Sequence, residues 1–403
     1  MTLRAAPRIT SRFWGETDCG VSRVFERNAI LGMGATSGRV EDAIALSPPD
    51  INIPSGETIT VKLINPVTFG PSILERFMEP AVPGLDTFKE VPSLSFLLEH
   101  PSGRKLVWDL GIRKDYLNYA PQVSNYIPST GYTLNVTKNV ADILVEGGVS
   151  LDEVEAVIWS HWHWDHIGDP STFPTTTDLV VGAGFKEAML PGAPANPESP
   201  LLESDYAHRT LREISFDGPH VLRIGSFPAF DYFGDGSFYL LDTPGHAVGH
   251  LCGLARTTKG PDTFVLLGGD VCHFAGILRP SKYLPVPESI FPHPCHPQGD
   301  MALCPGSAFD DLQRSRGREP TDALFDLCFG GDIPLARKTV GELQEFDCRE
   351  DIFVIIAHDM AVAEGVEHFP ASLNGWKEKG WGKGLKWSFF AEMRSYWESK
   401  GLA

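Results

Sequence analysis

The stretch SHWHWDHIGD, residues 160–169, packs three histidines and two aspartates into ten positions. It directly follows VEAVIWS, from Val154, a short apolar run of the kind that forms a buried strand. Imidazole and carboxylate groups are the ligands that zinc and similar divalent ions take in proteins. The run therefore predicts a metal site on a loop at a strand end, where a rigid framework holds the ligands in place.

The order of residues within this run is compatible with two neighbouring metal sites. In an extended chain, His161, His163 and Asp165 would face one way, and the intervening tryptophans would face the core or a groove wall. A turn near Asp165 would bring His166 to the same place. The competing interpretation treats these as polar loop residues, with Asp165 capping a helix that begins at His166. So dense a run of ligand-type residues favours the metal site.

Three later apolar runs also end on a ligand-type residue. SFYLLDTPGH ends on His246, TFVLLGGD ends on Asp270, and DIFVIIAHD contains His358 directly after its apolar part. Each occurrence alone is weak evidence, because aspartate and histidine at strand ends often cap turns. Repetition at four strand ends predicts that these side chains meet at one edge of a sheet.

The remaining pattern predicts an α/β layout with one folded domain over residues 58–403. Residues 1–57 are poorly patterned and are expected to form an N-terminal arm of loosely packed loops. Strands are expected in TITVKLINPVTF from Thr58, in a hairpin of LSFLLEH and KLVWDLG, and in DLVVGAG. Helices are expected from Val136 to a stop at Gly147, from Asp332, and in the tail after Leu373.

Two segments exceed what this layout needs. Residues 274–320 contain eight prolines with almost no periodicity, and residues 191–209 form a shorter insertion. A long irregular segment in a compact domain is usually functional or disordered. Residues 274–320 are therefore predicted to form a lid or pocket wall with some short helix, which would deepen an apolar pocket.

Charge and composition restrict the partners. The 403-residue chain carries a formal net charge of −18, which argues against nucleic acid and against an anionic membrane surface. No signal peptide and no run long enough to span a bilayer is recognised. Seven cysteines, an odd number without a CxxC pair, indicate reduced thiols in a cytoplasmic protein. A small molecule is the expected partner.

At this point the chain resembles a known family. HWHWDH is similar to the HxHxDH signature of the metallo-β-lactamase superfamily, and the later TPGH, GD and AHD elements follow in the family's order. The resemblance spans roughly residues 58–368. It implies an αββα sandwich that holds two metal ions, usually zinc, with iron or manganese as alternatives, in a groove at the sheet edges. Family members are often dimers, so a homodimer is a further expectation.

The resemblance also assigns the metal ligands. It implies that one metal is bound by His161, His163 and His246, that the other is bound by Asp165, His166 and His358, and that Asp270 bridges both. A hydroxide shared by the two metals would form near neutral pH and attack a carbonyl carbon. Asp165 would orient this hydroxide and pass its proton to the leaving group. The sequence has no GxSxG motif that would suggest a serine nucleophile.

Within the superfamily, the SHxHxDHxGD motif and the presence of Asp165 look most like the acyl-homoserine lactonase branch. In that branch a tyrosine shortly after the bridging aspartate contacts the substrate carbonyl, whereas GGDVCHFAG has Cys272 and His273 there. His273 and Tyr283 are the candidates for the tyrosine's role, and a surface position for His273 is the alternative. The chain also looks similar to fungal members, among which lactone, lactam and thioester substrates occur.

The predicted activity is hydrolysis of a cyclic ester or amide. Two alternatives stay open: a thioesterase acting on acyl-carrier or glutathione thioesters, and a catalytically silent metal-binding protein. His250 is expected to support the site or a turn rather than bind metal. His293 and His296, near Cys295, are expected to be an accidental cluster. Asp242 and Asp359 either orient ligand histidines or cap turns.

Overall fold

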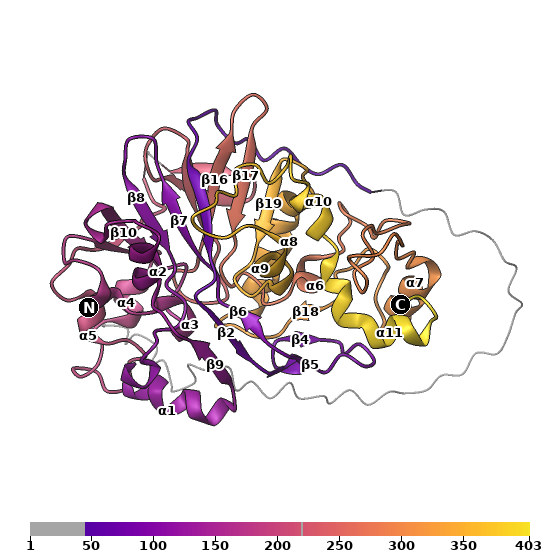
Figure 1. Ribbon diagram of the computed structural model, residues 1–403, viewed down its shortest axis with the longest axis horizontal. Helices are drawn as coiled ribbons and strands as arrows, with labels where there is room; N and C mark the ends of the chain where they lie inside the picture. The colour runs from indigo at the N-terminus through magenta and orange to yellow at the C-terminus, as the bar shows by residue number, and fades with distance from the viewer. Residues whose placement is uncertain (1–44, 219–220) are drawn as a thin grey trace, which may run out of the picture.

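The computed structural model describes residues 45–218 and 221–403, and two six-stranded sheets form its centre (Figure 1). The first sheet has the order β1-β7-β8-β10-β11-β12, with β8, β10, β11 and β12 parallel. Its strands are β1 (Thr60–Ile64), β7 (Ser95–Glu99), β8 (Lys105–Trp108), β10 (Val154–Ile158), β11 (Asp178–Val181) and β12 (Leu211–Glu213).

The second sheet has the order β13-β14-β15-β16-β17-β19. The first four pairings are antiparallel, and β17 pairs with β19 in parallel. Consequently β15, β17 and β19 all run in one direction. The strands are β13 (Leu222–Ile224), β14 (Phe227–Asp231), β15 (Phe238–Asp242), β16 (Leu251–Thr258), β17 (Thr263–Leu267) and β19 (Ile352–Ile355).

Strand residues alternate between two apolar layers, as the two-residue period of a strand requires. In β17, Val265 and Leu267 face the core between the sheets, whereas Phe264 and Leu266 belong to the core outside the second sheet. In β10, Ile158 faces the first of these cores, and Val157 faces a third core outside the first sheet. Each sheet therefore buries both faces.

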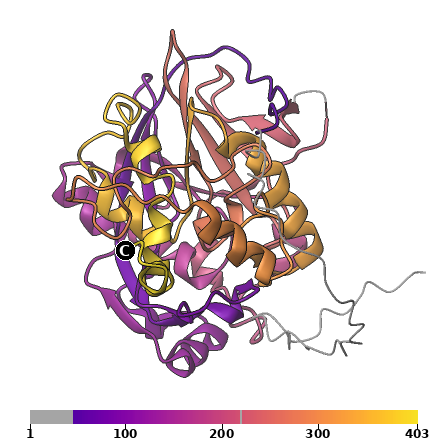
Figure 2. The same ribbon diagram turned by 90° about the vertical axis from the view of Figure 1, so that its right-hand side faces the viewer.

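Helices cover the two outer faces. The helices α1 (Pro121–Thr130), α2 (Val140–Glu146), α3 (Trp164–Ile167) and α4 (Phe185–Met189) contribute to the core outside the first sheet. The helices α6 (Ala275–Leu278), α7 (Gly306–Ser315), α8 (Ile333–Asp347) and α11 (Arg394–Ser399) contribute to the core outside the second sheet. Figure 2 shows orange helices and the yellow C-terminal segment on that side. The expected αββα sandwich is confirmed.

Two local expectations need correction. The run from Thr58 is not one strand: Asn65 and Pro66 separate β1 from β2 (Val67–Gly70), which joins a small sheet of order β6-β2-β9. The helix expected from Val136 begins at Val140, because residues 133–136 form β9 (Thr133–Val136), while β6 is Val91–Pro92. The helix α2 does end at Gly147, as expected.

Residues 274–320 pack against the body. Ile277, Leu303 and Phe309 lie in the core outside the second sheet, and each is at most 2% exposed. The expected short helical content is present as α6 and α7. Residues 1–44 of the expected arm lie outside the described residues, but Ile51 is buried in the same core. The folded body therefore includes the last part of that arm.

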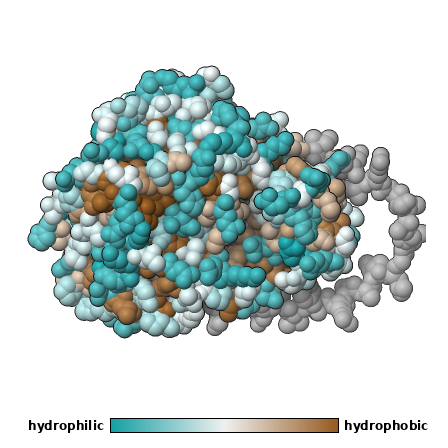
Figure 3. Space-filling view, viewed as in Figure 1, coloured by the Kyte–Doolittle hydropathy of each residue, from teal (hydrophilic) through white to brown (hydrophobic). Residues whose placement is uncertain are grey.

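Hydrophilic side chains cover much of the face in Figure 3, with smaller hydrophobic patches between them. Among the described helices, none combines the length and apolar character that crossing a bilayer requires. Free thiols among the described residues include those of Cys252, Cys272, Cys295, Cys304 and Cys348.

Replacing Phe346 by alanine should lower the free energy of unfolding by about 3–5 kcal/mol. Phe346 lies on α8, is fully buried, and has its ring 5.6 Å from that of Phe227. Phe291→Ala is the matched control, because Phe291 is 63% exposed. Denaturant titration of both variants measures the difference, and equal losses would show that the layer outside the second sheet is not a packed core.

Candidate metal centre

Four strand ends converge on one edge of the two sheets. In the first sheet, β10 leads into the motif that holds His161 and His163. In the second sheet, the loops after β15, β17 and β19 carry His246, Asp270 and His358. Because β15, β17 and β19 run in the same direction, their carboxyl ends lie at the same edge. The expectation that these residues meet is confirmed by two groups of converging side chains.

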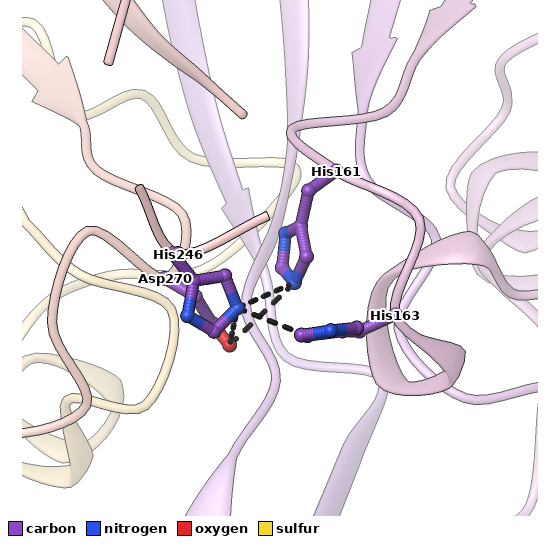
Figure 4. A group of neighbouring side chains, drawn as sticks. All are labelled: His161, His163, His246 and Asp270. Atoms are coloured by element: carbon purple, nitrogen blue, oxygen red, sulfur yellow. Dashed lines mark hydrogen bonds and ion pairs between the residues drawn. The ribbon is translucent and has the colours of Figure 1, made fainter. Parts of the chain in front are cut away.

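The first group consists of His161, His163, His246 and Asp270 (Figure 4). The Nε2 atom of His246 lies 3.1 Å from Nε2 of His161 and 2.9 Å from Nδ1 of His163. The Oδ2 atom of Asp270 lies 3.5 Å from Nε2 of His246 and 3.7 Å from Nε2 of His161. The four side chains point toward a common centre from both sheets.

The second group consists of Asp165, His166, His358 and the same Asp270. Here the Oδ1 atom of Asp270 lies 3.1 Å from Nε2 of His166 and 3.0 Å from Nε2 of His358. The Oδ2 atom of Asp165 lies 3.7 Å from Nε2 of His358. Asp270 therefore offers one oxygen to each group, as the arrangement expected from the sequence requires.

The donor set fits a pair of divalent metal ions. A tetrahedral zinc ion with bonds of about 2.0–2.1 Å separates its ligand atoms by about 3.3 Å, close to the spacings in the first group. Nε2 of His166 and Oδ1 of Asp270 are buried and lie 3.1 Å apart, but neither has a partner that meets hydrogen-bond geometry in the described structure. Leaving such atoms unpaired is costly, and a shared cation would satisfy them.

The motif turns where its ligands divide between the groups. His163 directly precedes α3, and Asp165 and His166 lie within this single helical turn. The turn expected near Asp165 is this short helix. It begins at Trp164, so Asp165 lies inside the helix and does not cap it. Trp162 and Trp164 are buried in the core outside the first sheet, as expected, and Trp164 also lines the pocket described below.

Hydrogen bonds fix the direction of the second group's histidines. Nδ1 of His166 donates to Oδ2 of Asp109 at 2.9 Å, and Nδ1 of His358 donates to the carbonyl oxygen of Pro92 at 2.7 Å. Each ring then directs the lone pair of Nε2 at the metal position. Burial raises the pKa of Asp109, and three donors from Ser160 and His166 oppose that rise.

Asp109 was missed in the sequence. It follows β8 directly, at the end of the run KLVWD, and β8 lies beside β10 in parallel. The same rule that found the other strand-end residues could have found it. Asp359, one of the two carboxylates considered for this supporting role, instead caps α9 (Met360–Gly365) by accepting the N–H of Val362.

His250 supports Asp270. Nδ1 of His250 donates to the carbonyl oxygen of Thr243 at 3.0 Å, so its Nε2 accepts the backbone N–H of Asp270 at 3.1 Å. Burial lowers the pKa of His250 to about 4, which keeps this ring neutral. Gly269, with φ of +51°, allows the close approach, since a Cβ there would lie 2.9 Å from Cβ of Ser160. The expected supporting role is confirmed.

Charges at the centre are unevenly distributed. Burial lowers the pKa of His163 to about 3 and holds those of His161 and His246 well below their usual range. Burial also opposes protonation of His166 and His358, but attraction by Asp270 and other carboxylates raises both pKa values above normal. Without metal, protons therefore occupy the second group and not the first.

A pocket of about 580 Å³, which includes part of its open mouth, adjoins both groups. His163, Asp165, Asp270, His273 and His358 form its metal-centre side. Aromatic rings form most of the remaining wall, which consists of Phe69, Ser72, Arg76, Phe77, Phe88, Val91, Tyr126, Tyr132, Trp164 and Phe329. The sequence did not identify this wall, because its residues follow no motif and come from segments far apart in the chain.

The two candidates for a carbonyl-facing residue lie in different places. His273 is buried at the centre, with Nε2 3.4 Å from Oδ2 of Asp270, so the alternative of a surface position is excluded. Tyr283 lines a separate groove with Lys282 and Lys338.

The segment 274–320 does not form a wall of this pocket. Among the residues described, those lining the metal-centre pocket include none from 274–320. That segment packs behind the second sheet instead.

His293 makes its hydrogen bonds to the backbone of two other residues. Nε2 of His293 donates to the carbonyl oxygen of Leu402 at 2.8 Å, and its Nδ1 accepts the N–H of Cys295 at 3.1 Å. Within the described part of the chain, His293 and His296 belong to neither of the groups that could hold a metal ion. The His293 side chain fastens its loop to the C-terminal residues.

Asp109→Asn should weaken metal binding about 10- to 100-fold, because the amide no longer fixes His166 as a carboxylate does. Asp242→Asn is the control, since Asp242 is also a strand-end carboxylate but belongs to neither ligand group. Competition with a coloured chelator measures the affinity of both variants. Equal affinity in the two variants would remove the supporting role of Asp109.

Metal binding should release protons, and metal affinity should fall as the pH is lowered from 8 to 6. The sign follows from the raised pKa values of His166 and His358, because each proton held at neutral pH must leave before the metal binds. Calorimetric titration in buffers of different ionisation enthalpy counts the protons. Binding with no proton release would contradict this arrangement of charges.

Comparison with known proteins agrees with this geometry. Residues 89–294 match the model of the metallo-beta-lactamase superfamily. A gamma-lactamase of Fusarium pseudograminearum is 40% identical over 86% of this chain and 85% of its own length. The cytochrome P450 monooxygenase mpaDE of Penicillium roqueforti is 39% identical over 96% of this chain, which spans only 43% of that longer protein.

A solved structure supports the fold. A mutant of B. thuringiensis AiiA, with N-decanoyl-L-homoserine bound at its active site, matches with a TM-score of 0.51. The match covers 78% of this chain and all of that one at 19% identity, so it concerns the fold alone. Together, the matched sequence, the αββα layers and the two ligand groups show that the chain belongs to the metallo-β-lactamase superfamily.

Proposed function

We propose that this protein is a metal-dependent hydrolase that opens a cyclic ester or amide, a lactone or lactam. The observation that carries the proposal is the pair of ligand groups sharing Asp270 at the base of a largely aromatic pocket. A flat ring fits walls made of aromatic side chains. The similarity to a gamma-lactamase over most of both chains supports the same reaction class.

We assign seven residues to the metals. His161, His163 and His246 hold one ion, Asp165, His166 and His358 hold the other, and Asp270 holds both. Zinc is the proposed metal, because the nitrogen-rich first group suits it, with iron or manganese as alternatives. When bound, the metal pair lowers the pKa of water at the site and polarises the carbonyl that is attacked.

Asp165 is the proposed proton carrier. Its carboxylate lies in the second group and lines the pocket, so it faces both the ligands and the substrate. There it accepts a proton from the attacking water and delivers it to the ring oxygen or nitrogen that leaves. The hydroxyl of Ser93 donates to the backbone carbonyl of Asp165, which holds this residue in place.

His273 is the proposed hydrogen-bond donor to the substrate carbonyl. It lies beside Asp270 in the pocket, and its ring is stacked with that of His358 at 5.7 Å. It occupies the place in the chain where homoserine lactonases have a tyrosine. We favour His273 over Tyr283, because Tyr283 lies in the separate groove.

Location and assembly remain predictions. We propose the reducing cytoplasm as the location, supported by an odd number of cysteines without a CxxC pair and by the free thiols of Cys252, Cys272, Cys295, Cys304 and Cys348. The homodimer is a prediction of the family resemblance, which size measurement in solution would test.

A panel that pairs each lactone with its lactam and with an open thioester of the same acyl group tests the reaction class. The zinc-loaded protein should turn over a ring substrate with the highest kcat/KM, and chelation should abolish that activity. Preference for the open thioester would move the protein to the thioesterase alternative. No turnover of any member, with full zinc content, would favour the silent metal-binding protein.

Asp165→Asn should lower kcat on the best substrate by a factor of about 100 or more, because the amide cannot carry the proton. Elemental analysis of the same sample should show that much of the metal is retained. His161→Ala is the contrasting variant, which should lose metal from the first group. Near-normal turnover by Asp165→Asn would rule out its role as proton carrier.

A further inference from the structure

Arg76 introduces a positive charge into an otherwise aromatic wall. Of the residues that line the metal-centre pocket, it is the only lysine or arginine. It closes the short helical turn Leu74–Arg76, and its half-buried side chain lines the pocket. The whole chain is acidic, so its surface field does not by itself gather anions. A local cation at this position therefore has a specific consequence for the substrate.

The Arg76 guanidinium is held among rings and not by a carboxylate. Its Nη2 atom donates to the hydroxyl of Tyr126 at 2.5 Å, and its Cζ atom lies 5.7–5.8 Å from the ring centres of Phe77, Tyr126 and Phe329. Within the described residues, no Asp or Glu forms an ion pair with it, whereas Arg104, Arg113 and Arg279 all have one. Several of its five N–H donors stay available to a ligand.

One aromatic ring separates Arg76 from the metal ligands. The ring of Phe329, which the guanidinium contacts, lies 5.2 Å from that of His273 and 5.9 Å from that of His246. Phe77 makes the same connection, with its ring 5.0 Å from that of His273. A substrate whose ester or amide reaches the metal centre would therefore extend past these rings to the guanidinium.

We propose that the pocket selects a flat cyclic substrate that carries a carboxylate, and that Arg76 binds this carboxylate. The planar guanidinium pairs with a carboxylate through two parallel hydrogen bonds, and the desolvating rings around it strengthen the pair. Tyr126 orients the guanidinium by accepting its hydrogen bond. This inference rests on the proposed function, because it names the substrate class of the same site.

The experiment uses 3,4-dihydrocoumarin with a carboxylate at each open position of its benzene ring, and the carboxamide of the same shape. For at least one position, the zinc-loaded protein should prefer the acid by about 10- to 100-fold in kcat/KM, mainly through KM. Arg76→Met should abolish this preference by lowering kcat/KM for the acids much more than for the amides, whereas Arg76→Lys should retain part of it. Tyr126→Phe should reduce it less than Arg76→Met does.

Arg314→Met is the matched control, because Arg314 lies on α7 with an exposed side chain and should change nothing. If the protein shows no preference for the acid, or if the preference persists in Arg76→Met, the assignment of Arg76 to a carboxylate is wrong. Either result leaves the proposed hydrolysis of a lactone unaffected. Failure to hydrolyse any acid or amide removes the proposed function instead. Calorimetric binding of the same pairs to zinc-loaded Asp165→Asn, with and without Arg76→Met, then decides the role of Arg76 without turnover.

Discussion

The carboxylate of Asp270 is the interaction on which the arrangement of the site depends. It is buried between two groups of histidines and offers a different oxygen to each. A buried negative charge requires compensation, which the protons on His166 and His358 provide in part and which two metal ions would provide fully. The position of Asp270 is fixed by the hydrogen bond that its backbone N–H donates to Nε2 of His250 and by the turn at Gly269.

Both sheets are needed for this arrangement. The loop after β17 in the second sheet carries Asp270, whereas Asp109 and the motif that includes His166 follow strands of the first sheet. The core between the sheets fixes their distance, so the packing of residues such as Ile158 and Leu267 determines whether ligand atoms meet within a few ångströms. The centre is therefore a consequence of sandwich packing rather than of any single loop.

Chemistry and selectivity are contributed by different parts of the chain. The ligand loops supply the proposed catalytic groups, Asp165 and His273. The segment between β1 and β7, residues 65–94, supplies Phe77 and Arg76, which line the same pocket. Substitutions of these two side chains can therefore alter substrate binding without replacing a residue of either ligand group. This division is consistent with a superfamily in which one ligand set serves several classes of substrate.

The sequence by itself determined which ligand-type residues converge at one sheet edge and how the layers are arranged. The histidines directly after VEAVIWS can be recognised from the local sequence alone. The same holds for the strand-end residues His246, Asp270 and His358. Only the tertiary structure decided the pocket wall, the supporting role of Asp109 and the separate position of Tyr283. The physical reason is that these depend on contacts between segments far apart in the chain, which leave no periodic or spaced signature in it.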